Sequence, residues 1–144
     1  MCTCLIAGRR ASRSGYALLA ANDDWDDTPA LLTHVPRQKP APDAVYTLVG
    51  GHTIPEIGET CGYLYTACKY EIGTLDRAWA GGTNDRNVSV AGTGVMAFKA
   101  IPWEGMVLEP DDIPLLILRR AETARGAVEL IGELVARYGL RPSR

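Results

Sequence analysis

The sequence predicts an α+β fold in which short strands come first and two helices follow. Short apolar runs, separated by turns rich in glycine and polar residues, fill the first two thirds of the chain. The last third carries signals for the start and end of helices. A length of 144 residues suits one domain with its own hydrophobic core. Strands followed by helices are typical of layered α+β proteins.

The strands are predicted from the apolar runs in chain order. Residues 2–8 form a buried strand that a basic turn ends, and residues 16–22 follow with hairpin spacing. Residues 44–51 and 62–70 are two further strand candidates. Residues 77–94 indicate a strand, a tight turn and a strand, because the turn contains residues that tolerate positive φ.

Two segments between these strands are predicted as loops. Residues 23–30 are acidic and rich in turn-forming residues. The segment from Leu31 to Asp43 carries Pro36, Pro40 and Pro42, which suit an extended loop more than a helix.

The first helix is predicted to begin at Asp111 and Asp112, since acidic residues ahead of a proline mark a helix N-terminus. Thr123 can cap a second helix that ends near Tyr138, with Gly139 just beyond it. Apolar residues recur along one face of this second helix, and we expect that face to pack on a sheet. The face comprises Val128, Ile131, Leu134, Val135 and Tyr138.

Composition argues against several classes of partner. A formal net charge of -2, with no basic run, argues against nucleic acid. No stretch approaches the roughly 18–20 apolar residues of a membrane span. The first residues lack the positive and hydrophobic regions of a signal peptide, so we expect a cytoplasmic protein.

The four cysteines should be thiols in such a compartment unless they bind metal or do chemistry. Their C-x-C and C-x6-C spacings differ from the paired C-x2-C of a strong zinc site, and the chain has only two histidines. A small metal-binding domain that uses Cys2, Cys4, Cys61 and Cys68 remains one alternative. Cys61 and Cys68 flank an apolar segment and are predicted to be buried structural thiols.

Cys2 carries the sharpest functional hypothesis. Removal of Met1 is expected because the next residue is small, and Cys2 would then carry an α-amine beside its thiol. An α-amine has a pKa of about 7.7–8.0 and can take the proton of the thiol when it is neutral. The thiolate can then attack an acyl carbon, so one residue supplies both nucleophile and base. A metal ligand, half of a disulfide and an inert core residue are the other interpretations.

Four segments match one family pattern in the same order along the chain. Residues 2–24 follow Cys-Thr-Thr-x-x-x-Gly, a Lys/Arg-Ala-Ser turn, Asp/Ser-Gly, and a strand ending in Ala-Arg-Asn-x-Asp. Residues 53–65 follow Ile-Pro-x-x-x-Glu-Thr-x-x-Tyr, residues 80–93 follow Gly-x-Asn-Glu-x-Gly-Val-x-x-Ser, and residues 109–139 match a helical region. On these segments the chain resembles the dipeptidase A and secernin family of N-terminal-nucleophile amide hydrolases. The matched positions in the first segment are Cys2, Thr3, Gly8, Ala11, Ser12, Gly15, Asn22 and Asp24.

The resemblance implies an Ntn-hydrolase-type αββα sandwich and cleavage of an amide bond, usually in a dipeptide. The wider superfamily includes choloylglycine hydrolases and penicillin V acylases. It implies that Cys2 is the nucleophile and its amine the base, and that Asp24 holds this amine. It also implies that the side-chain amide of Asn84 helps to form the oxyanion hole. Neither a metal nor an organic cofactor is implied.

Three departures from the family pattern qualify these expectations. Ala21 replaces an arginine that favours the thiolate, and Asn87 replaces a glycine. Family members are usually longer, so residues 1–144 are expected to form a single incomplete domain, completed by a homo-oligomer, a partner polypeptide or a missing C-terminal part. A catalytically degenerate binding or scaffold module is therefore the second functional hypothesis. The arginines that could replace the missing one are Arg9, Arg10 and Arg13.

Overall fold

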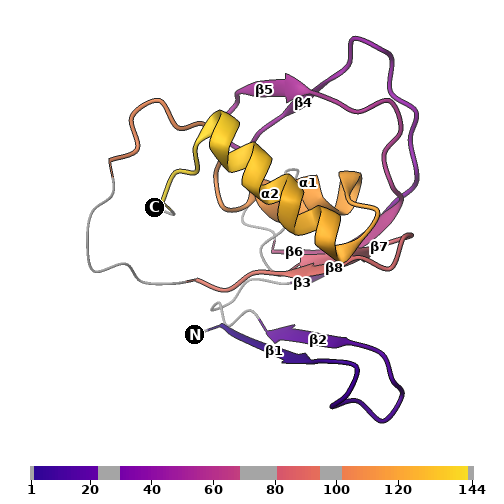
Figure 1. Cartoon of the computed structure of the whole chain (residues 1–144). Coiled ribbons are helices and arrows are strands. Elements are labelled where there is room, and N and C mark those ends of the chain that lie inside the picture. Colours follow the sequence, from indigo (N-terminus) through magenta and orange to yellow (C-terminus); the bar gives the residue numbers. More distant parts are fainter. Residues whose placement is uncertain (1, 23–29, 69–80, 95–101, 143–144) are drawn as a thin grey trace.

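The structure is a computed structural model that describes residues 2–22, 30–68, 81–94 and 102–142. It confirms the α+β class, with antiparallel sheets followed by two helices near the C-terminus. Figure 1 shows the N-terminal hairpin on one side of the central sheet and the helices on the other. None of the helices in the described part of the chain is long and apolar enough to cross a membrane.

The N-terminal hairpin consists of β1 (Thr3–Ala7) and β2 (Leu18–Asn22), as the two apolar runs predict. Their antiparallel register runs from Thr3 opposite Asn22 to Ala7 opposite Leu18. The side chains of Leu5 and Ile6 are 66% and 78% exposed. The prediction that residues 2–8 form a buried strand is therefore right about the strand and wrong about its burial. The hairpin gains little stability from burial of its own side chains.

The central sheet has the strand order β3-β6-β7-β8. Its strands are β3 (Ala30–Val35), β6 (Tyr63–Cys68), β7 (Gly81–Asn84) and β8 (Ser89–Ala91), and each neighbouring pair is antiparallel. The prediction that β6, β7 and β8 are strands is confirmed.

The predicted loop from Leu31 to Asp43 is wrong in its first part, because Ala30–Val35 forms β3 and pairs with β6. The prolines of this segment begin only at Pro36, so every backbone N–H of β3 is available for pairing. The loop prediction applies only to the residues after the strand.

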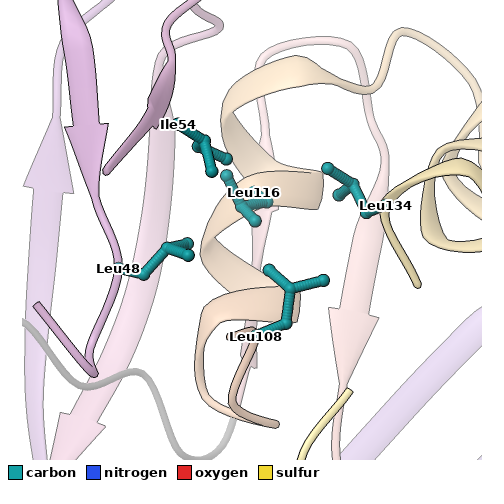
Figure 2. Close-up of a cluster of buried hydrophobic side chains, with 5 residues drawn as sticks. All are labelled: Leu48, Ile54, Leu108, Leu116 and Leu134. Atoms are coloured by element: carbon teal, nitrogen blue, oxygen red, sulfur yellow. The ribbon is translucent and has the colours of Figure 1, made fainter. Parts of the chain in front are cut away.

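A separate two-stranded sheet joins β4 (Val45–Thr47) and β5 (Thr53–Pro55). Figure 2 shows the apolar cluster in which side chains from this small sheet meet the helices. The cluster is formed by Leu48, Ile54, Leu108, Leu116 and Leu134, all of them buried.

Both predicted helices are present, as α1 (Asp112–Arg120) and α2 (Ala124–Tyr138). The Oγ1 atom of Thr123 accepts a hydrogen bond from the Gly126 N–H at 3.0 Å, which confirms the predicted cap. Gly139 has φ 65° just beyond α2, where a glycine ends a helix at little cost.

At the start of α2, the residue that faces inward is Ala127 and not the predicted Val128. Val128 is 69% exposed, whereas Ala127 is buried against Val88 and Ile117. Helix α2 packs against α1, and Leu134 of its apolar stripe also shares a buried cluster with Ile54 of β5, so the expectation that this stripe packs on a sheet is confirmed in part. The small side chain of Ala127 lets α2 approach α1 closely, which the apolar pattern alone does not indicate.

Helix α1 covers one face of the central sheet, where it contacts β7 and β8. Tyr63 and Tyr65 point to this face and form a buried cluster with Leu115 and Leu118. Side chains alternate between the two faces of a strand, so Leu64 points to the opposite face and is 41% exposed.

Candidate active site

Cys2 lies immediately before β1 and is half-buried. The next residue, Thr3, forms the terminal pair of the hairpin with Asn22. Its backbone N–H donates to Oδ1 of Asn22 at 2.8 Å. A side chain therefore holds the backbone directly after the candidate nucleophile.

The other side of this backbone contacts the segment that follows β8. Oγ1 of Thr93 donates to the carbonyl oxygen of Cys2 at 3.5 Å, and Sγ of Cys4 donates to the carbonyl oxygen of Gly92 at 3.5 Å. These contacts attach the start of the hairpin to the end of the β7–β8 unit. The family pattern includes Asn22 without assigning it a role, and no sequence signal had indicated Thr93.

Asp24 lies outside the described residues, as does Met1. The predicted contact between the Asp24 carboxylate and the α-amine of Cys2 therefore remains a prediction. Asn22, two residues earlier in the chain, lies at the Cys2 end of the hairpin.

Asn84 occupies a different environment from Cys2. Its side chain is only 4% exposed, and Nδ2 donates to the carbonyl oxygens of Leu118 and Ala121 at 3.2 and 2.7 Å. Its Oδ1 accepts the backbone N–H groups of Arg86 and Val88. Both amide donors are therefore engaged at the C-terminal end of α1.

The strand register also separates Asn84 from Cys2. Asn84 pairs with Tyr63, whose side chain lies on the helix-covered face, whereas the hairpin lies on the other side of the sheet (Figure 1). Asn84 is three residues along β7 from Gly81, or roughly 10 Å. Gly81 pairs with Ala91, the last residue of β8. Gly92 and Thr93, which contact the start of β1, follow directly after it. The structure does not bring the two predicted residues together, and the oxyanion role of Asn84 stays a prediction.

Ala21 replaces the family arginine and pairs with Cys4 in the hairpin, close to the candidate nucleophile. The arginines considered as replacements lie in the loop that joins β1 to β2, at the opposite end of the hairpin. The five residues of β1 between that loop and Cys2 span roughly 17 Å. The structure therefore places Arg9, Arg10 and Arg13 far from Cys2.

Asn87 replaces the family glycine in the turn between β7 and β8 and has φ 58°. An asparagine tolerates this left-handed conformation better than most residues. Its N–H donates to the carbonyl oxygen of Asn84 at 3.0 Å, which closes the turn. This departure from the pattern is therefore compatible with the turn that the glycine would make.

Cys61 is buried, and its Sγ lies 3.9 Å from the carbonyl oxygen of Ala121. Burial raises the pKa of this thiol, and the nearby Asp85 carboxylate adds to the rise. The prediction of a buried structural thiol is confirmed for Cys61, whereas the side chain of Cys68 lies outside the description. Within the part of the chain that the structure describes, no three His, Cys, Asp or Glu side chains gather as a metal site.

A buried ion cluster that no sequence pattern indicated is formed by Glu56, Arg119 and Arg120. The Glu56 carboxylate, 3% exposed, pairs with Arg119 and, at 3.1 Å, with Arg120. Burial alone would raise the pKa of Glu56, but the Ile57 N–H and the two guanidinium groups outweigh this effect and lower it. The cluster joins the end of β5 to α1, on the side of the sheet away from the hairpin.

The model of Peptidase family C69 matches residues 1–144. The chain belongs to peptidase family C69. A comparison with individual curated proteins gave no match. Membership in family C69 identifies the general class as a cysteine peptidase or hydrolase, in agreement with the resemblance that the sequence carries.

Proposed function

We propose that the protein is a cysteine N-terminal-nucleophile hydrolase that cleaves an amide bond in a dipeptide or small acyl-amide through Cys2. The position of Cys2 carries this proposal. It lies immediately before β1, and both sides of the peptide group that follows it are held by side chains. A nucleophile needs such a fixed position to attack a bound carbonyl group efficiently. Membership in peptidase family C69 supports the same class of reaction.

The proposed reaction proceeds by acyl transfer. Once Met1 is removed, the α-amine of Cys2 takes the proton from Sγ, and the thiolate attacks the carbonyl carbon of the amide. The amide C–N bond then breaks, and the α-ammonium returns the proton to the departing amine. Water attacks the resulting thioester, releases the acid and restores the thiol. No step in this sequence requires a metal or an organic cofactor.

An oxyanion forms in both halves of this reaction and needs hydrogen-bond donors. We keep Asn84 as a proposed donor, although its Nδ2 group already donates to Leu118 and Ala121. To serve this role, it would have to exchange these two bonds for a bond to substrate and also come within reach of Cys2, from which the strand register separates it. Backbone N–H groups beside Cys2 are the competing donors. Asp24 has a separate proposed role, which is to hold the α-amine of Cys2.

Alkylation with iodoacetamide tests the proposal directly. We expect Cys2 to react fastest, because its amine activates the thiol, and Cys2→Ala to remove both this labelling and dipeptide hydrolysis. Cys4→Ala is the matched control, since Cys4 is also a half-buried thiol at the same end of the hairpin. Intact mass should show loss of Met1. Equal labelling of Cys2 and Cys4, with no hydrolysis of a dipeptide panel, would contradict the proposal.

A degenerate binding or scaffold module is the second candidate, and one observation favours it. Ala21 leaves the hairpin without the family arginine, and the loop arginines lie at the far end. Neither the family arginine nor the three loop arginines therefore support the thiolate. The scaffold hypothesis predicts an unreactive Cys2 in a folded protein, so the same labelling experiment separates the two functions.

We also propose that a second chain covers exposed apolar surface of this domain, as a homo-oligomer or a partner polypeptide. Leu32 and Leu64 lie on the face of the central sheet opposite α1, and Leu5 and Ile6 lie on the hairpin. Large exposed apolar patches are typical of surfaces that bind another protein. The proposed compartment is the cytoplasm, where Cys2, Cys4 and Cys61 would stay as thiols.

A further inference from the structure

We propose that Asn22 and Thr93 are positioning residues that fix the orientation of Cys2 for attack. This inference rests on the proposed role of Cys2 as the nucleophile. It assigns roles to two side chains that do not touch the reacting atoms, and it starts from the hydrogen bonds at the beginning of β1.

Asn22 holds the N–H side of the Cys2–Thr3 peptide group. It is the last residue of β2, and its Oδ1 accepts the Thr3 N–H at 2.8 Å. Thr3 and Asn22 form the pair of the hairpin that lies next to Cys2. The side chain of Asn22 thus supplies a hydrogen bond to the backbone directly after the proposed nucleophile.

Thr93 holds the carbonyl side of the same peptide group. Its Oγ1 donates to the carbonyl oxygen of Cys2 at 3.5 Å. The preceding residue, Gly92, accepts the thiol proton of Cys4 at 3.5 Å. Two consecutive residues after β8 therefore contact the backbone and side chains at the start of β1.

The two contacts have a particular consequence for a residue at the start of a chain. A peptide group is planar, so holding its oxygen and its N–H fixes the plane that follows Cys2. After removal of Met1, Cys2 has no preceding peptide group to hold it from the other side. The positions of the α-amine and Sγ relative to this fixed plane then depend only on the ψ and χ1 angles of Cys2. Small errors in these rotations move the thiol away from the carbonyl carbon, and misplacement of about 1 Å can cost a large part of the rate.

Thr93→Val and Asn22→Ala test the two positions separately. Each should lower the rate constant of Cys2 alkylation and the kcat of dipeptide hydrolysis about tenfold or more, with little change in KM. Thr93→Ser keeps the hydroxyl group and should restore both rates. Asn22→Asp keeps an acceptor for the Thr3 N–H but adds a negative charge, so its alkylation profile should move to higher pH. Thr83→Val is the matched control, because the Thr83 hydroxyl bonds Ser89 in the same β7–β8 unit.

The outcomes separate this inference from the proposed function. If wild type shows no selective Cys2 labelling and no hydrolysis, the proposed function fails. If wild type is active and Thr93→Val and Asn22→Ala match it in kcat and in alkylation rate, the positioning roles are overturned. Equal losses in Thr93→Val, Thr93→Ser and Thr83→Val would also overturn them, because a general loss of stability would then explain the effect. Circular dichroism of each variant verifies the fold.

Discussion

The side-chain amide of Asn84 donates to the main-chain carbonyl oxygen of Ala121 at 2.7 Å, across 37 positions of sequence. The same nitrogen donates to Leu118, so one side chain joins the β7–β8 turn to the end of α1. Carbonyl groups at a helix end lack partners within the helix. Asn84 satisfies two of them in the buried interior.

Asn84→Ala should therefore lower the free energy of unfolding by about 2–4 kcal/mol, because several buried backbone groups lose their partners. Urea denaturation followed by circular dichroism measures this loss. Asn84→Asp is the companion variant, since it keeps the acceptor for Val88 but faces Ala121 with a carboxylate. If Asn84→Ala keeps the stability of wild type and loses only hydrolysis, Asn84 acts in the oxyanion hole and not in the fold.

Glu56→Gln should destabilise the protein by about 3–5 kcal/mol, because it leaves the charges of Arg119 and Arg120 buried without a full counter-charge. Equilibrium unfolding in urea measures the change. Glu59→Gln is the matched control: Glu59 pairs with Arg37 at 3.1 Å, but its side chain is 45% exposed. The control should leave the unfolding midpoint nearly unchanged. Equal effects of both variants would contradict the distinction between buried and exposed pairs.

The Glu56 cluster also predicts a direction of acid sensitivity. The pKa of Glu56 is lower in the folded protein than its ordinary value, so the unfolded chain binds the proton more readily. The stabilisation is complete above about pH 4.3, the ordinary glutamate value, and is lost as the pH falls through the lower folded pKa. Unfolding of wild type and Glu56→Gln across this range measures the effect. Parallel pH profiles of the two proteins would contradict it.

Gly82→Ala should destabilise the central sheet by about 1–3 kcal/mol. A Cβ at this position would overlap the Leu64 carbonyl oxygen and lie 2.9 Å from Cα of Tyr65. Thermal unfolding measures the loss. Gly58→Ala is the matched control, since a Cβ there meets nothing within 4 Å, and it should be neutral or slightly stabilising. An unchanged melting temperature for Gly82→Ala would contradict this prediction, because it would mean that β6 and β7 move apart with little loss of stability.

Leu64→Ser should weaken self-association if a second copy covers the outer face of the central sheet. Gel filtration should show wild type eluting above the monomer mass of 15.5 kDa and the variant shifting towards it. Val128→Ser is the matched control, because Val128 is exposed on α2 and lies outside this face. A wild-type protein that elutes as a compact monomer would overturn the proposed homo-oligomer, and a stable complex with a different polypeptide would support the partner alternative.

The sequence predicted those parts of the fold that depend on local pattern. Thr123 and Gly139 mark the two ends of α2, because capping and left-handed backbone depend on residue type. The strand Ala30–Val35 was missed because the prolines after it obscured its own pattern. Its pairing with β6 is a contact between segments far apart in sequence, which local propensity does not encode.

The candidate site was predictable to the extent that chemistry depends on residue type. Cys2 was predicted as the nucleophile because its place in the chain and its thiol suit a known type of reaction, and this role stays a prediction. The hydrogen-bond partners of Asn84 could not be found, since they depend on how α1 packs on β7. The contacts of Asn22 and Thr93 with the start of β1 depend on strand register in the same way.

The exposed hairpin has a consequence for how the protein loses activity. Cys2 belongs to a hairpin whose side chains are mostly exposed, whereas the three apolar clusters lie among the other elements. Partial unfolding of the hairpin costs less free energy than unfolding of those clusters. Mild denaturant should thus inactivate the protein while the far-ultraviolet spectrum of the helices remains intact. Any ligand or second chain that covers the hairpin would then protect catalysis against denaturation by mass action.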